Sequence, residues 1–273
     1  MNNFVLRATS GLIYVFLIAF ISMYSPWGLI IGLGFLFILC FWELQKILDF
    51  DNLWYAVAAF AASAYLFGSY AYRFYHGQSY EPFSFIALMP SLLFFMLIYI
   101  IFKRPDEIAY DTSKLIFMAV YLGIPFALVF RFMHKSELND FQNFTPLFLI
   151  FALIWFSDTF AYITGSLIGK TTFTKISQNK TLEGLAGGFI SVLILGAFIQ
   201  YYLTNIRGNW IVISILIGIF APLGDLAESK IKRLFGVKDS GNLIPGHGGF
   251  LDRLDSFLMV SVVVYTYYMI FEL

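Results

Sequence analysis

The chain has 273 residues, of which 60% are hydrophobic and only 12% are charged, and its formal net charge is zero. A soluble domain usually carries about 25% charged residues, so this composition excludes an ordinary soluble domain and favours an integral membrane protein. The zero net charge points to no class of partner, and we expect no nucleic-acid partner. The single cysteine, Cys40, lies in an apolar run and excludes an intramolecular disulfide.

Long apolar stretches recur along the whole chain. Crossing about 30 Å of hydrocarbon takes roughly 20 mainly apolar residues in a helix. The charge-free run from Ala8 to Trp42 is too long for one helix, and Ser25-Pro26 divides it into two. Further spans are expected near Asn52–Tyr72, Pro82–Phe102, Leu115–Met133, Thr145–Ile168, Leu185–Ile206, Asn209–Leu226 and Leu254–Phe271. The chain is therefore predicted to be an all-α polytopic membrane protein with about nine transmembrane helices.

The distribution of positive charge orients these helices. With a cytoplasmic N-terminus, the outer segments hold only four of the 17 Lys and Arg residues: Arg73, Arg131, Lys135 and Arg207. Because cytoplasmic loops carry an excess of Lys and Arg, this bias favours a cytoplasmic N-terminus. We predict a single membrane domain over residues 1–273. Its N-terminal helices fill residues 1–144, and its catalytic helices and cytoplasmic loops fill residues 145–273.

Asp158 lies inside the apolar segment Thr145–Ile168. A carboxylate at membrane depth costs at least about 2.5 kcal/mol, which makes Asp158 a candidate for a functional site. The alternative is a polar contact between helices.

The segment GSLIGKT, residues 165–171, follows that span and resembles a nucleotide-binding P-loop. A P-loop has four residues between its glycines, whereas this segment has three and no strand precedes it, so we reject that interpretation. Lys170 can still bind phosphates together with backbone N–H groups, or it can anchor the helix end at the membrane surface. Further on, Thr181 and Glu183 are typical of a helix cap, which leaves Lys180 unexplained.

Two pairs of carboxylates are expected at the cytoplasmic edge of the membrane. Asp225 and Glu228 close the eighth span, and Asp252 and Asp255 open the ninth. Residues three apart share a helix face, and four carboxylates brought together repel one another unless a cation joins them. Oxygen ligands without cysteine favour Mg²⁺. The sequence leaves open whether a second cation, monovalent or divalent, joins it. The alternative is a set of salt bridges to Lys230, Lys232, Arg233 or Arg253.

Basic residues and glycines lie between the two acidic pairs. They are Lys232, Arg233, Lys238, Gly246, Gly248 and Gly249. The cations can bind phosphate oxygens, and the glycines allow the backbone to approach a ligand closely. His247 can donate to a phosphate or act as an acid, or it can simply be a turn residue. This combination suits phosphoryl or nucleotidyl transfer onto a lipid that stays in the bilayer.

The same residues belong to a wider signature. Its main block, residues 229–255, reads SKIKRLFGVKDSGNLIPGHGGFLDRLD, and shorter blocks lie at residues 157–170 and 180–184. Together they resemble the phosphatidate cytidylyltransferase (CDP-diacylglycerol synthase) family. The resemblance is close over residues 157–255 and rests only on hydropathy and span number upstream. One departure is Gln178, where the family often has proline.

The resemblance implies transfer of a cytidylyl group from CTP to phosphatidic acid, which yields CDP-diacylglycerol and pyrophosphate and requires Mg²⁺. It also implies a homodimer in the inner membrane of a bacterium, with the active site facing the cytoplasm. By matching position, Asp225 and Asp252 are the expected metal ligands, and Asp158, Glu228 and Asp255 are catalytic carboxylates. The predicted substrate-binding residues are Lys170, Lys180, Lys232, Arg233, Lys238, Gly248, Gly249 and Arg253, and His247 is a further catalytic candidate.

Two other functions were weighed. A CTP-dependent lipid kinase of the polyprenol or phytol type would transfer the γ-phosphate to an alcohol and release CDP. An ion or solute transporter would also suit intramembrane carboxylates. The polar residues gather at one face, and discontinuous helices paired across two repeats are not seen in the sequence, which argues against a transporter.

Overall fold

The computed structural model describes residues 3–23, 25–77, 85–133, 138, 144–174, 177, 180–244 and 248–271. This described part is helical, and apart from two isolated β-bridges it contains no strand. The helices are α1 (Asn3–Met23), α2 (Pro26–Leu48), α3 (Leu53–Tyr75), α4 (Phe85–Lys103), α5 (Asp111–Met118), α6 (Ile124–Phe132), α7 (Pro146–Ile168), α8 (Leu182–Tyr202), α9 (Trp210–Leu234) and α10 (Leu251–Phe271). A 3-10 turn, η1 (Pro105–Ile108), precedes α5, and a π-helical segment, η2 (Ala119–Gly123), joins α5 to α6.

Seven helical segments in this part of the chain are long and apolar enough to cross a membrane. They are Pro26–Leu48, Ile86–Lys103, Asp111–Phe132, Pro146–Ile168, Leu182–Tyr202, Trp210–Leu234 and Leu251–Phe271. The all-helical prediction is therefore confirmed. Of the other two expected spans, one falls on α1, where the described residues give the apolar stretch Gly11–Met23. The other falls on α3, which is rich in tyrosine and alanine.

The predicted division at Ser25-Pro26 is confirmed. The Ser25 hydroxyl accepts a hydrogen bond from the Gly28 N–H at 2.9 Å and so caps α2. Pro26 occupies the first turn, where its missing N–H has no helical partner to lose. Thr145 and Pro146 begin α7 in the same way.

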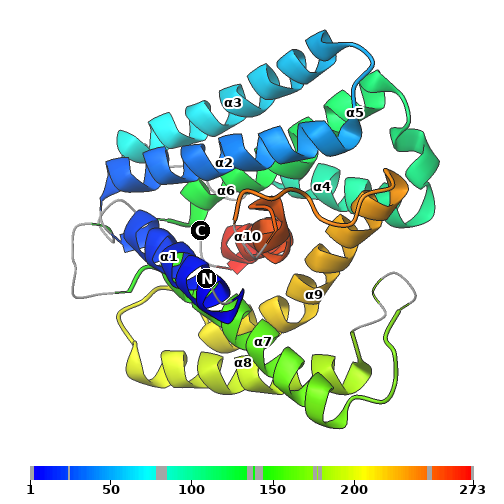
Figure 1. Ribbon diagram of the computed structural model, residues 1–273. Coiled ribbons are helices and arrows are strands. Elements are labelled where there is room, and N and C mark those ends of the chain that lie inside the picture. Colours follow the sequence, from blue (N-terminus) through cyan, green and yellow to red (C-terminus); the bar gives the residue numbers. More distant parts are fainter. Residues whose placement is uncertain are drawn as a thin grey trace.

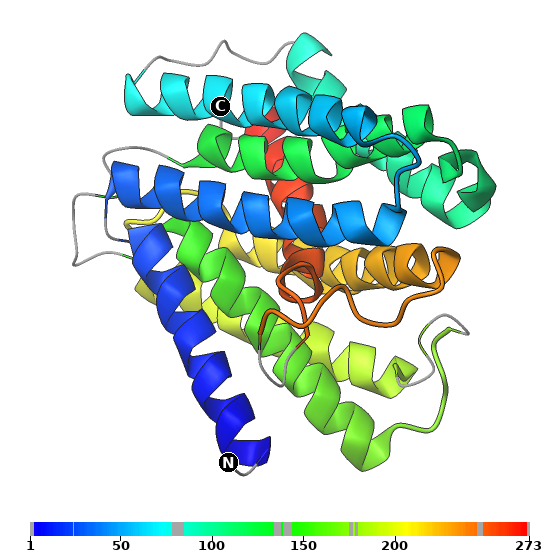
Figure 2. The same cartoon turned by 45° about the horizontal axis from the view of Figure 1, so that its top comes forward.

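Helix α10 lies at the centre of the fold, with α7, α8 and α9 on one side and α2, α3 and α6 on the other (Figure 1). It is buried over nearly its whole length, and its core residues include Phe257, Val264 and Tyr268. Figure 2 shows α1 leaning away from this bundle while it crosses α7. Large apolar side chains such as Phe16 and Ile194 are exposed on α1 and α8, as is typical of a surface that faces lipid.

Helix α9 is longer than the sequence indicated. The span was expected to end near Leu226, but α9 continues to Leu234. The charges that marked its end are neutralised within the helix, because the Lys232 ammonium lies 2.7 Å from Glu228, one turn earlier. As a result, Asp225, Glu228 and Lys232 are carried by one rigid helix.

Glycines let two helix pairs approach closely near these polar residues. A Cβ on Gly188 of α8 would lie 2.7 Å from the Ser157 carbonyl oxygen of α7, and a Cβ on Gly224 of α9 would lie 2.7 Å from the Asp255 carbonyl oxygen of α10. Small residues at such crossings allow backbones to pack directly. The helices that carry Asp158, Asp225 and Asp255 are thereby fixed relative to their neighbours.

Candidate active site

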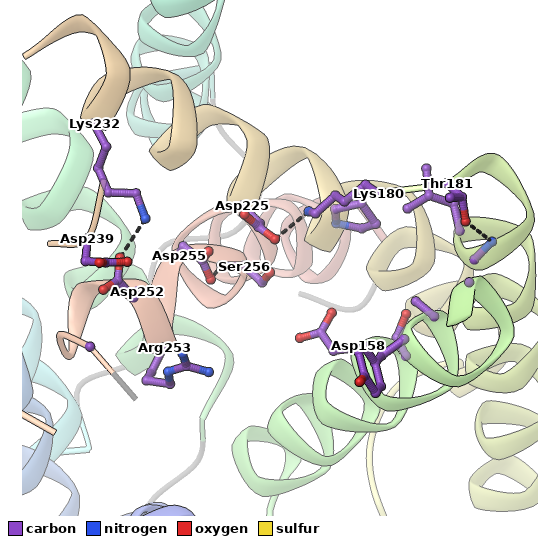
Figure 3. A pocket seen from close by; sticks show the side chains of 18 of the residues that line it. Asp158, Lys180, Thr181, Asp225, Lys232, Asp239, Asp252, Arg253, Asp255 and Ser256 are labelled. Carbon is purple, nitrogen blue, oxygen red and sulfur yellow. Dashed lines mark hydrogen bonds and ion pairs between the residues drawn. The ribbon is translucent and has the colours of Figure 1, made fainter. Parts of the chain in front are cut away.

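An open cavity of about 1250 Å³ lies among α7, the start of α8, α9 and the start of α10. Eight of the predicted site residues line it: Asp158, Lys180, Asp225, Lys232, Gly248, Asp252, Arg253 and Asp255. Figure 3 shows the acidic and basic side chains projecting into the same space from different helices. Residues almost 100 positions apart in the sequence are therefore gathered in one chamber.

One side of the cavity is formed by Lys180 and Asp225. The Lys180 ammonium forms an ion pair with Asp225 Oδ2, and the Ser229 hydroxyl donates to Asp225 Oδ1 at 3.2 Å. Lys180 is held in place by Thr181, which caps α8 by accepting a hydrogen bond from the Gly184 N–H at 3.1 Å. The cap is thus confirmed for Thr181, whereas Glu183 accepts hydrogen bonds from the N–H groups of Lys170 and Thr171, both at 3.1 Å. The ion pair with Asp225 gives Lys180 a role that helix capping does not explain.

The other side of the cavity is formed by Lys232 and Asp252. The Lys232 ammonium donates to Asp252 Oδ1 at 2.6 Å and also lies 2.7 Å from Glu228 Oε2. Asp252 Oδ2 accepts hydrogen bonds from the N–H groups of Ser240 at 3.1 Å and Gly249 at 2.9 Å. Its carboxylate is therefore held by both a cation and the backbone.

Glu228 lies behind this pair and does not line the cavity. It is 1% exposed, and neither of its carboxylate oxygens has a hydrogen-bond partner in the described part of the chain. Its contact with Lys232 is an ion pair without hydrogen-bond geometry. Glu228 reaches the cavity through its ion pair with Lys232, which lines it.

Asp158, Asp255 and Arg253 complete the chamber. Asp158 projects from α7 across the cavity from Asp225 and Asp255 (Figure 3). Asp255 Oδ1 accepts a hydrogen bond from the Ser256 N–H at 2.6 Å. Arg253 is exposed, and its carbonyl oxygen accepts a hydrogen bond from the Tyr14 hydroxyl of α1 at 3.1 Å.

Five of the other predicted residues do not line the cavity. Those described but not lining the cavity are Lys170, Arg233, Lys238, Glu228 and Gly249. Arg233 donates to the Val237 carbonyl oxygen at 2.9 Å, and Lys170 and Lys238 are exposed. His247 and Gln178 lie outside the described residues, so their predicted contributions stay predictions.

Besides Asp239, which lines the cavity and had no predicted role, the sequence analysis missed two residues near the cavity. Ser240 donates its N–H to Asp252, and its hydroxyl donates to the carboxylate of Glu43 on α2 at 3.0 Å. Glu43 is completely buried. The sequence feature that could have identified Glu43 is its place directly after the charge-free run that ends at Trp42.

The donor set of the cavity fits Mg²⁺ only in part. Five carboxylates line it: Asp158, Asp225, Asp239, Asp252 and Asp255. Within the described residues, however, no three acidic, histidine or cysteine side chains converge closely enough to hold a metal ion by themselves. Mg²⁺ usually binds through one or two carboxylates together with waters and substrate phosphates. The carboxylates of the cavity fit this mode of binding, but the described residues do not by themselves form a complete set of metal ligands.

A smaller cavity of about 340 Å³ adjoins the first. It is lined by Tyr14 and Val15 of α1 and by Phe151, Ile154 and Trp155 of α7. It shares the lining residues Asp158, Asp252, Arg253 and Asp255 with the larger cavity. An apolar branch between α1 and α7 therefore reaches the polar residues.

Comparison with known proteins gives one consistent result. A protein of Staphylococcus saprophyticus named phosphatidate cytidylyltransferase is 38% identical over 173 residues, which are 62% of this chain and 64% of that protein. Proteins of the same name from Bacillus subtilis and Staphylococcus aureus are 38% identical over 164 residues and 36% identical over 173 residues. The Bacillus subtilis match covers 59% of this chain and 58% of that protein. The Staphylococcus aureus match covers 62% of this chain and 64% of that protein. These matches span less than two thirds of the curated relatives, but the family-level match extends over residues 5–271. The chain therefore belongs to the cytidylyltransferase family.

Proposed function

We propose that this protein transfers a cytidylyl group from CTP to phosphatidic acid and so forms CDP-diacylglycerol and pyrophosphate. The observation that carries the proposal is the cavity, in which carboxylates and cations from several helices meet an apolar branch. Membership of the cytidylyltransferase family over residues 5–271 and the name of the relatives support the same reaction.

In this proposal the cations of the cavity bind the phosphates of both substrates. Arg253 is exposed, and a guanidinium can bind phosphate oxygens in a bidentate manner. Lys180 is partly exposed, so its ammonium can move from Asp225 to a nucleotide phosphate. Such contacts hold the phosphatidate oxygen in line with the α-phosphorus of CTP.

The reaction needs no general base, because the attacking phosphatidate oxygen is already anionic. A bond forms between this oxygen and the α-phosphorus, and the bond from the α-phosphorus to the oxygen bridging it to the β-phosphorus breaks. The bridging oxygen leaves with pyrophosphate. Lys180, Lys232 and Arg253 stabilise the negative charge that develops on the phosphate oxygens.

Asp225 and Asp252 are the residues proposed to hold Mg²⁺, with Asp158 and Asp255 beside them. When bound, the ion would neutralise charge on the triphosphate and on the leaving pyrophosphate. Asp225 becomes available when Lys180 turns to the nucleotide. Asp252 keeps its backbone hydrogen bonds and can offer one oxygen.

The lipid substrate is proposed to enter between α1 and α7. The branch lined by Val15, Phe151 and Trp155 suits the upper part of the acyl chains, while the phosphate reaches Arg253. The rest of the lipid then remains in the bilayer.

We further propose nine membrane crossings with a cytoplasmic N-terminus, which places the cavity on the cytoplasmic face of a bacterial inner membrane, and assembly as a homodimer. Single cysteines introduced by Glu107→Cys and Asn205→Cys in a Cys40→Ala background test the orientation. In intact cells an impermeant maleimide should label only the Asn205→Cys protein. Labelling of only the Glu107→Cys protein would reverse the topology.

The decisive experiment measures pyrophosphate released by purified protein given CTP, phosphatidic acid and Mg²⁺. Controls omit the lipid or add EDTA, and chromatography identifies the lipid product. Release that requires all three components, with a CDP-lipid product, supports the proposal. Formation of CDP with a polyprenol, and no pyrophosphate, would favour a lipid kinase instead.

A further inference from the structure

Glu43 is a buried carboxylate for which the proposed reaction has no direct use. It lies on α2 and is 0% exposed, and it does not line the cavity. Its Oε1 accepts a hydrogen bond from the Phe250 N–H at 3.0 Å. Its Oε2 accepts hydrogen bonds from the Leu251 N–H at 2.8 Å and from the Ser240 hydroxyl at 3.0 Å. Because a buried charge is costly unless it is paired or hydrogen-bonded, these three donors explain how it is retained.

The two backbone donors belong to the start of α10. Leu251 is the first residue of that helix, and Phe250 directly precedes it. The first N–H groups of a helix lack partners within the helix, and its positive end favours an anion. Glu43 therefore caps α10 from α2, although it stands 208 positions earlier in the chain than Leu251.

Ser240 extends this connection to the cavity. Its hydroxyl, which donates to Glu43, accepts a hydrogen bond from the Asp252 N–H at 3.3 Å, and its own N–H donates to Asp252 Oδ2 at 3.1 Å. The loop packs directly on the Glu43 carboxylate as well. A Cβ on Gly241 would lie 2.8 Å from Glu43 Oε1, and one on Gly249 would lie 2.7 Å from its carboxyl carbon.

We propose that Glu43 is a positioning residue for cytidylyl transfer. It holds the loop between α9 and α10 at Ser240 and at Phe250 and, through Ser240, fixes the direction of the Asp252 carboxylate. It does so without touching either substrate. The identity of the reaction rests on the proposed function, whereas the anchoring of the loop rests on the hydrogen bonds alone.

The variant Glu43→Gln tests this role. An amide has one acceptor oxygen where the carboxylate has two, so at least one of the three donors faces an NH₂ group. We expect kcat to fall at least about tenfold and the Mg²⁺ concentration for half-maximal rate to rise, because hydrogen bonds to charged groups are among the stronger ones. The KM for phosphatidic acid should stay unchanged, since the branch between α1 and α7 is not altered.

Hydrogen–deuterium exchange gives a readout that does not depend on activity. The amides of residues 240–244 and 248–252 should exchange about tenfold faster or more in Glu43→Gln, because local opening governs their protection. Exchange in α7 and α8 should be unchanged.

Two control variants separate positioning from general damage. Glu107→Gln makes the same chemical change in an exposed ion pair with Arg104 and should leave both readouts as in the wild type. Thr145→Ala removes a buried hydroxyl that donates to the Ser22 carbonyl oxygen at the far end of α7 from Asp158. It should lower the melting temperature without raising the Mg²⁺ requirement. A Glu43→Gln protein that behaves like Thr145→Ala in every respect would overturn the proposal.

If Glu43→Gln yields no folded protein, Ser240→Ala tests the same role. It removes only the hydroxyl and leaves the bonds from Phe250 and Leu251 to Glu43. We expect a weaker rise in both the Mg²⁺ requirement and the exchange rate, and an unchanged magnesium titration would refute the role. Wild-type protein is assayed in parallel. If it shows no reaction with CTP and phosphatidic acid, the proposed function fails, while the exchange data still decide whether Glu43 anchors the loop.

Discussion

Two lysine–aspartate pairs flank the same cavity, and their surroundings differ. The side chains of Lys180 and Asp225 are 22% and 34% exposed, whereas those of Lys232 and Asp252 are each 10% exposed. Among the described residues, backbone N–H groups and a further buried acid, Glu228, contact only the second pair. Exposed pairs contribute little to stability and exchange partners easily, while a buried pair is costly to break. The first pair is thus suited to open for a charged substrate, and the second to hold the shape of the cavity.

The largest effect is expected for Lys232→Met. Asp252 and Glu228 would lose the cation they share, and breaking a buried pair by removing one partner costs about 3–5 kcal/mol. Lys180→Met should lower the free energy of unfolding by no more than about 1 kcal/mol, since its partner remains in contact with solvent. Unfolding of both variants by SDS titration in bicelles measures the difference. Equal losses would remove the distinction between the two pairs.

Asp225→Asn should have the next largest effect, and on turnover rather than on stability. Removing one preorganised electrostatic partner of a transition state lowers turnover by about 100-fold or more. The loss of a partly exposed ion pair should change the free energy of unfolding by less than about 1 kcal/mol. A Mg²⁺ titration of the pyrophosphate-release rate tests its assignment as a ligand. Asp106→Asn, an exposed carboxylate outside the cavity, is the matched control.

The contrast between the pairs shows what the sequence could and could not reveal. Charge clusters at helix ends identified Asp225, Asp252 and most of the charged residues that line the cavity, because charged groups in apolar segments are costly and therefore conspicuous. The sequence did not show which lysine neutralises which acid, since that depends on how α8, α9 and α10 meet. It also ended α9 near Leu226, because a run of charges resembles a loop until Lys232 is seen to neutralise Glu228.

The N-terminal helices were harder to interpret for the same reason. Their apolar residues predicted the spans, and Ser25-Pro26 correctly divided the first two. Glu43 was not singled out in the sequence, because its partners Ser240 and Leu251 lie about 200 positions away. Only the packing of α2 against the start of α10 reveals its contacts.

Asp158→Asn changes a carboxylate on the opposite wall of the cavity from the two lysine–aspartate pairs. Asp158 projects from α7 toward the exposed pair, and its carboxylate forms no ion pair in the described part of the chain. We expect turnover to fall about tenfold, because the field around Asp225 changes, and the melting temperature to stay constant. Steady-state rates and thermal unfolding of the same preparation measure both. Normal turnover would place Asp158 outside the reacting centre.

The smallest effect is expected at the cap that holds Lys180. Thr181→Ala and Asn209→Ala each remove an N-cap side chain, from α8 and α9 respectively, and each should cost about 1 kcal/mol of stability. Of the two, only Thr181 lines the cavity and adjoins Lys180, so only its variant should also lower the rate, and mainly by raising the KM for CTP. Because both variants lose an N-cap side chain, comparing them removes the loss of stability that they share. If both variants lowered the rate equally, the position of Lys180 would not depend on its cap. The start of α8 would then move as freely as the Lys180–Asp225 pair that is suited to open.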